Sequence, residues 1–107
     1  MAKFLLLYSG GVGMPASEAE FAAVTQAWVD WYTSLGSAVI DPGNPLVPAS
    51  MSIASNGSVR DGSAGVMATG YTVLGADSMA AAVKMAQGCP VLKGGADITV
   101  YEIHELM

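Results

Sequence analysis

Side chains that could bind or transform a small molecule gather where an expected helix ends and a proline-rich loop follows. Trp28 and Trp31 lie in that helix, and Asp41 and Asn44 lie in the loop after it. Ligand pockets are mostly apolar, with a few polar groups that fix orientation, and this set has that composition. Tyr71 could line the same cavity, although its ring could equally pack in a sheet. The spacing therefore favours a ligand-binding pocket at this junction.

Ordinary structural roles compete with this interpretation. Helical spacing makes both tryptophans core candidates first, and an aspartate before a proline commonly begins a turn. If the chain catalyses a reaction, we expect Asp41 to act as the general base, with His104 as the second choice. A lone histidine is, however, most often a surface or hydrogen-bonded residue.

Several kinds of chemistry are excluded by the residues themselves. The segment Gly11–Ala16 satisfies the G-x-G-x-x-A pattern, but Pro15 removes an amide donor and the helix cap is delayed to Ser17, so we expect a flexible loop and no nucleotide. The chain has one histidine and one cysteine, with neither HxxxH nor CxxC spacing. We therefore predict no metal and no cofactor. Cys89 follows a helix C-terminus, where the dipole opposes a thiolate, and is expected to be a small packed residue.

Two helices and four main strands are expected to position these residues. Ser17 and Glu20 form a capping box at the start of the first helix, and Gly36 is expected to end it as a left-handed cap. One apolar stripe on this helix comprises Phe21, Val24, Trp28, Trp31, Tyr32 and Leu35. The second helix runs from a cap at Asp77 to Gly88, with a buried face of Met79, Ala82, Val83 and Ala86.

Strands are expected at 4–8, 37–40, 71–74 and 98–104, and the continuous apolar run at 4–8 is typical of a central strand buried on both faces. Asn56-Gly57 predicts a type I′ hairpin. The order β, α, β with a hairpin, β, α, β predicts an α+β fold, a ferredoxin-like split βαβ sandwich. Its four-stranded antiparallel sheet would carry two helices on one face.

Composition bounds the possible partners. The 107 residues predict a single domain, residues 1–107, and the net charge of −5 with scattered basic residues excludes nucleic acid and anionic membrane surfaces. Only 12% of the residues are charged, against about 25% in typical soluble domains. We therefore predict a homodimer that covers the open sheet face.

The apolar run at 4–8 is too short for a signal peptide, and a lone cysteine indicates the cytoplasm.

The stretch GYTVLGADSMAAAVKMAQGCPVLKGGADITVYEI, together with KFLLLYSGG, AWVDWYTSLG and DPGNPL, resembles the YCII-related (DGPF-type) domains. The resemblance implies a ferredoxin-like domain that dimerises into an α/β barrel. The catalytic feature proposed for that family is a histidine on the first helix paired with an aspartate. In this chain Thr25 stands nearest the histidine position, and Asp61-Gly62-Ser63-Ala64 replaces the D-G-P-F tetrapeptide. The resemblance therefore carries no His-Asp mechanism onto this chain.

Two functions follow from the sequence. The first is a homodimer that binds or transforms a small organic molecule in a cleft beside the first helix. The second is a non-catalytic dimeric module that serves in interactions or as an accessory protein.

Overall fold

The computed structural model describes residues 1–11 and 17–106 as an α+β fold, with two helices and a four-stranded antiparallel sheet. The strands of the main sheet are β1 (Ala2–Gly10), β2 (Val39–Asp41), β5 (Ala68–Ala76) and β6 (Ala96–Ile103). The helices are α1 (Glu18–Leu35) and α2 (Met79–Ala86), with short 3-10 turns η1 (Gly36–Ala38) and η2 (Pro90–Gly94). A separate hairpin consists of β3 (Met51–Ile53) and β4 (Val59–Asp61).

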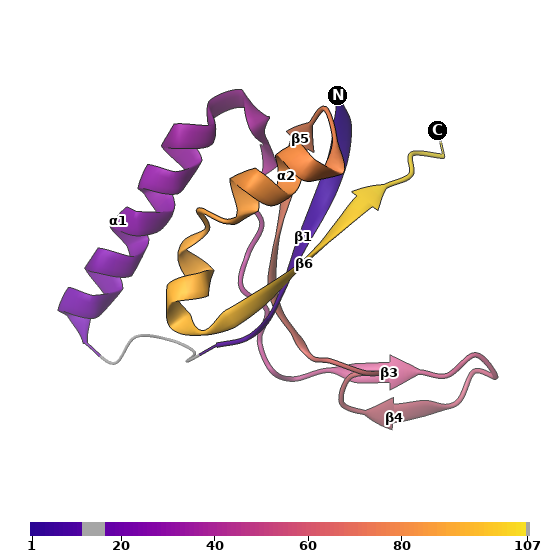
Figure 1. The fold of residues 1–107 in the computed structure, drawn as a ribbon. Coiled ribbons are helices and arrows are strands. Elements are labelled where there is room, and N and C mark those ends of the chain that lie inside the picture. The colour runs from indigo at the N-terminus through magenta and orange to yellow at the C-terminus, as the bar shows by residue number, and fades with distance from the viewer. Residues whose placement is uncertain (12–16, 107) are drawn as a thin grey trace.

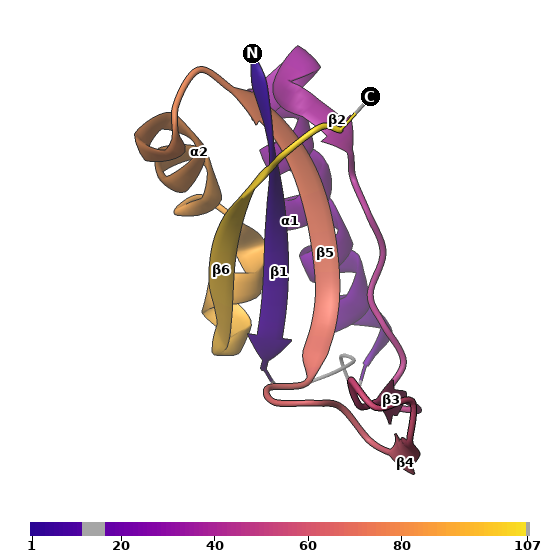
Figure 2. The same ribbon diagram turned by 90° about the vertical axis from the view of Figure 1, so that its right-hand side faces the viewer.

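The strand order β2-β5-β1-β6 places β1 and β5 in the centre of the sheet. Consequently β5 separates the two strands that α1 connects, and β1 separates the two that α2 connects. Figure 1 shows both helices on the same side of the sheet, and Figure 2 shows the opposite side, which no helix covers. The expected antiparallel sheet with two helices is confirmed.

The core lies between the helices and one face of the central strands. Phe4 and Leu6 are fully buried and Tyr8 nearly so, whereas Leu5 and Leu7 are only half-buried. Side chains alternate between the two faces of a strand, so the first set points toward the helices and the second away from them. The prediction of burial on both faces is therefore wrong for the single chain, because no second layer covers the far face.

Helix α1 begins and ends close to the predicted residues. The hydroxyl of Ser17 accepts a hydrogen bond from the Glu20 amide at 3.1 Å, which satisfies one of the free amides of the first turn. Gly36 follows the helix with a φ of 57°, but its ψ of −126° lies outside the left-handed helical region, so the expected cap differs in detail. The next strand, β2, starts only at Val39 because η1 intervenes.

The apolar stripe of α1 is covered only in its second half. Trp31 is the buried residue of the helix, whereas Phe21 is 51% exposed and Val24 43% exposed. An 18-residue helix is about 27 Å long, and its first turns extend past the part that packs on the core. An apolar strip therefore remains open along the first half of α1.

In α2 the capping residue differs from the prediction. The Ser78 hydroxyl, and not the Asp77 carboxylate, accepts the Ala81 amide at 3.1 Å, because the helix starts one residue later than expected. Ala82 and Ala86 are buried as expected. The other two residues of the predicted buried face, Met79 and Val83, remain about two-fifths exposed. They lie beside the terminal strand β6 instead of inside the core.

The hairpin is confirmed, but its turn is not of type I′. That turn needs a positive φ at both central residues, and among the described residues only glycines have one, so Asn56 does not qualify. Gly57 alone has a φ of 91°, and the Ala54 amide donates to the Ser58 carbonyl. This is the pattern of a longer loop that ends in a glycine bulge. The hairpin stands away from the main sheet (Figure 1).

Candidate functional site

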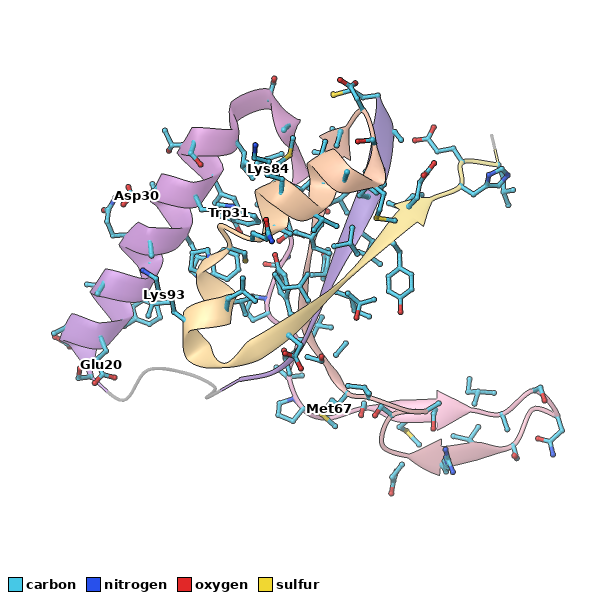
Figure 3. The ribbon with its side chains drawn as sticks, in the orientation of Figure 1. Glu20, Asp30, Trp31, Met67, Lys84 and Lys93 are labelled. Carbon is cyan, nitrogen blue, oxygen red and sulfur yellow. The ribbon has the colours of Figure 1, made fainter. Side chains whose placement is uncertain are left out.

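Four aromatic rings pack together where α1 meets the sheet. The ring of Trp28 lies 5.7 Å from those of Trp31 and Tyr32 and 5.9 Å from that of Tyr8 on β1, measured between centroids. The Trp31 indole N–H donates to the carbonyl of Met85 at 3.1 Å, which holds this ring between α1 and α2 (Figure 3). Trp31 is therefore a core residue, whereas Trp28 and Tyr32 are half-buried at the edge of the cluster.

A chain of hydrogen bonds runs beneath this aromatic cluster. The Cys89 thiol donates to the Tyr8 hydroxyl at 3.6 Å, and that hydroxyl donates to Thr72 Oγ1 at 2.6 Å. Thr72 in turn donates to the carbonyl of Pro42 at 3.0 Å, which also accepts the Tyr32 hydroxyl at 3.1 Å. The chain connects the loop after α2, both central strands and the loop after β2. Every hydroxyl in it has an acceptor, as buried polar groups require.

The electrostatics of this hydrogen-bond chain keep its members neutral. Burial raises the pKa of the Tyr8 hydroxyl well above its usual range, and the hydrogen bond to Thr72 only partly offsets this. Burial likewise raises the pKa of Tyr32 and of the Cys89 thiol. A thiolate nucleophile or a phenolate base is thus disfavoured at neutral pH. The chain therefore offers no ready nucleophile, and its hydroxyl oxygens can still accept hydrogen bonds.

Two of the predicted polar residues lie beside α1, and Asp41 is the last residue of β2 and not part of the loop, in which Asn44 lies. The Asp41 carboxylate accepts the Gly43 amide at 2.8 Å, so it organises the turn in the way expected of an aspartate before a proline. It is exposed, and it is near enough to Tyr32 to contribute to the raised pKa of that residue. Asn44 contacts the sheet through its main-chain carbonyl, which accepts the Tyr71 amide at 3.3 Å. The structure thus brings Trp28, Asp41 and Tyr32 to one junction.

The other two predicted residues lie elsewhere. Tyr71 alternates with Thr72 along β5, so its ring is on the sheet face that points away from the tryptophans. His104 follows the last residue of β6 and is exposed. Because β2 and β6 are the opposite edges of the sheet, His104 and Asp41 are separated by three inter-strand spacings, roughly 14 Å. They cannot act on one atom within a single chain.

Sequence reasoning did not select Tyr8 or Thr72. Tyr8 belongs to a continuous apolar run, and such a run does not show which residues point inward. In the structure these are residues 4, 6 and 8. Thr72 gave a stronger signal, because it is a hydroxyl at an inward position of a strand that otherwise turns Leu74 and Ala76 inward. The prediction that Cys89 is a small packed residue is confirmed, since it is 2% exposed.

Two hollows lie away from the aromatic cluster. The larger, with a volume of about 620 Å³, is an open groove between α2, η2 and β6, and we call it the α2–β6 groove. The smaller, of about 240 Å³, lies on the β3–β4 hairpin. Neither is lined by a residue that the sequence singled out as a ligand contact. The lining of the α2–β6 groove consists of Met79, Val83, Ala86, Gln87, Leu92, Asp97, Ile98, Thr99 and Val100.

Comparison with known proteins adds no assignment, since no family model and no curated protein matches the chain. Over residues 1–11 and 17–106, no three histidine, cysteine or carboxylate side chains gather as metal ligands would. No helix in the same ranges is long and apolar enough to cross a membrane. The candidate site is therefore defined by its own geometry alone.

Proposed function

We propose that the protein is a homodimer that binds a small, largely apolar organic molecule against the open side of α1. The observation that carries this proposal is the apolar strip on α1, which is exposed at Phe21 and Val24 and half-buried at Trp28 and Tyr32. Aromatic and aliphatic side chains next to a few polar groups have the composition of a ligand site. The Tyr32 hydroxyl lies next to this strip, because its ring contacts Trp28 directly. Its hydrogen is donated to the Pro42 carbonyl, so its oxygen can accept a hydrogen bond from a ligand.

The hydrogen-bond chain supports binding more than catalysis. Its thiol and phenol groups are held in their neutral forms, and their hydrogens are already donated within the chain. What Tyr32 offers a ligand is therefore an acceptor oxygen, which suits a molecule that donates a hydrogen bond, such as an aryl alcohol. Any proton transfer would fall to Asp41, which is the carboxylate at the junction. Unchanged turnover in Asp41→Ala would remove that role. The alternative function, a non-catalytic interaction or accessory module, is supported by the same lack of an activated group.

The dimer is proposed from the sheet face that the helices leave open. Six residues of β1, β5 and β6 that are in register with one another form the centre of this face, and none of the six is charged. They are Leu5, Leu7, Tyr71, Val73, Thr99 and Tyr101. An apolar sheet face of this size normally marks an interface. Two such faces packed together would give the ferredoxin-like barrel that the family resemblance implies.

The ligand proposal is tested by nuclear magnetic resonance, because the chain has only two indole N–H groups. We expect 1-phenylethanol, whose hydroxyl group donates to the Tyr32 oxygen, to shift the Trp28 indole signal in a saturable way. Ethylbenzene, which lacks the hydroxyl group, should bind at least several-fold more weakly. Trp31 is the internal control, since its indole is buried and bonded to a main-chain carbonyl. Equal shifts of both signals, or no saturable shift of Trp28, would contradict the proposal.

The dimer is tested by sedimentation at micromolar concentration. Val73→Glu places a charge at the centre of the open sheet face and should convert a dimer into a monomer. Val29→Glu is the matched control, because Val29 is 48% exposed on α1, outside the proposed interface. A wild-type protein that sediments as a monomer, or a Val73→Glu dimer as tight as the control, would refute this interface.

A further inference from the structure

The segment 46–67, which we call the arm, contains the β3–β4 hairpin and its flanking loops. It presents a series of apolar side chains to solvent, and its charged residues are only Arg60 and Asp61, so its net charge is zero. An isolated two-stranded hairpin is marginally stable in water, because it has no second layer on which to bury its side chains. The most exposed apolar residues of the arm are Val47 (75%), Met51 (66%), Ile53 (72%), Val59 (58%) and Val66 (80%).

The arm is placed where a second copy would meet it. Figures 1 and 2 together show that it leaves one end of the sheet and projects to the side that no helix covers. That side is the proposed dimer interface. The Leu46 amide bonds to the Thr69 carbonyl at the base of the arm, and Asn56 lies at its tip. Ten extended residues span roughly 30 Å, whereas packed sheets are only about 10 Å apart. The arm is therefore long enough to pass the sheet of a partner.

The shape of the single chain also indicates that the arm is covered by something. The radius of gyration is 15.2 Å, compared with about 13 Å for a compact domain of this length. The accessible surface is 7255 Å², roughly 1,700 Å² more than a compact monomer of 10.9 kDa exposes. Such an excess on each of two copies falls in the range that obligate dimers bury. A second copy of the chain is thus a sufficient occupant.

The α2–β6 groove is complementary to the arm. Most of its lining is apolar, and β6 is a terminal strand of the sheet, so its outer edge has no neighbouring strand. The charged side chain of the groove is Asp97, and the cationic side chain of the arm is Arg60. The chain carries nine acidic and four basic residues, so a neutral arm approaches a partner without the repulsion that two acidic surfaces would suffer.

We infer that, in the homodimer, the arm of each copy lies in the α2–β6 groove of its partner. Ile53 and Val59, which are opposite each other in the hairpin and therefore share one of its faces, supply the apolar contact. The inference rests on the proposed dimer and goes beyond it, because it assigns an occupant to a groove that borders the sheet interface at Thr99. The contact would also give the hairpin a second layer on which to bury its apolar side chains.

Disulfide trapping tests this arrangement. In a Cys89→Ala background, the double variant Ile53→Cys/Val83→Cys should form a covalent dimer on mild oxidation, at least fivefold more than either single variant. The matched control is Ile53→Cys/Ala22→Cys, in which the second cysteine lies on the exposed outer part of α1. Sedimentation of the reduced proteins is measured in parallel.

The outcomes separate the two proposals. Trapping in the arm–groove variant above the control supports the inference. A reduced protein that remains dimeric but is trapped no better than the control refutes the arm–groove contact and leaves the sheet-face dimer standing. Efficient trapping of Ile53→Cys alone, which would mean that two arms meet each other, also refutes it. A monomer at every concentration refutes both the arm contact and the dimer.

Discussion

The pair Tyr8 and Thr72 offers the sharpest quantitative test of the hydrogen-bond chain. Thr72→Val keeps the shape of the side chain but leaves the buried Tyr8 hydroxyl without its acceptor at 2.6 Å. An unsatisfied buried donor costs about 2 kcal/mol of unfolding free energy. Tyr8→Phe costs less, about 1 kcal/mol, because Thr72 still donates to the Pro42 carbonyl. In a domain of this size, 1 kcal/mol corresponds to a shift of about 4 °C in the midpoint of thermal unfolding.

The double variant distinguishes a true hydrogen bond from mere proximity. Tyr8→Phe/Thr72→Val replaces both partners by apolar groups, so it should cost about 1 kcal/mol less than the sum of the single variants. Urea unfolding at one fixed protein concentration measures all three variants, since the midpoint would depend on concentration if the protein forms the proposed dimer. Additive losses would show that the two hydroxyls are not coupled, which is incompatible with a hydrogen bond between them.

Three further predictions concern the same core. Gly43→Ala should prevent folding or cost several kcal/mol of unfolding free energy, because φ is positive and the new Cβ would overlap the carbonyl of Tyr71. The control is Gly62→Ala, which has a positive φ but open space around the new Cβ and should cost only about 1 kcal/mol. Equal thermal unfolding midpoints for the two variants would refute this. Since burial raises the pKa of Cys89 from 9.0, its contribution to stability is complete below pH 9 and is lost as the pH rises above 9. In denaturant titrations at pH 8 and pH 10, the free energy of unfolding should therefore fall less between the two pH values in Cys89→Ala than in the wild type. Trp31→Phe removes a hydrogen bond and buried volume and should cost roughly 2 kcal/mol in calorimetry, whereas a neutral effect would mean that this ring is not part of the core.

Local signals in the sequence were sufficient for most of the secondary structure. Ser17 and Glu20 fixed the start of α1, and the β-forming residues of the last strand fixed β6, because capping and alternation depend only on neighbouring residues. These local signals were insufficient where two neighbouring residues could both cap the same helix. Asp77 and Ser78 are both good caps by residue type, and only the structure shows that the serine accepts the Ala81 amide.

The candidate site shows the same division. The sequence could place Trp28, Asp41 and Asn44 at one junction, since they are close along the chain. It could not show that Tyr71 points to the opposite face, or that His104 lies at the other sheet edge from Asp41, because both facts depend on strand order and register.

The amino-acid sequence by itself determined the α+β class, the two helices, the hairpin and the shortage of charge, all of which follow from composition and short-range pattern. Only the tertiary structure decided which face of each element is buried. It joined Cys89, Tyr8 and Thr72, residues up to 81 positions apart, into one hydrogen-bond chain. It also left the first half of the α1 stripe and the arm open to solvent, because contacts between distant segments, and not local preference, set burial.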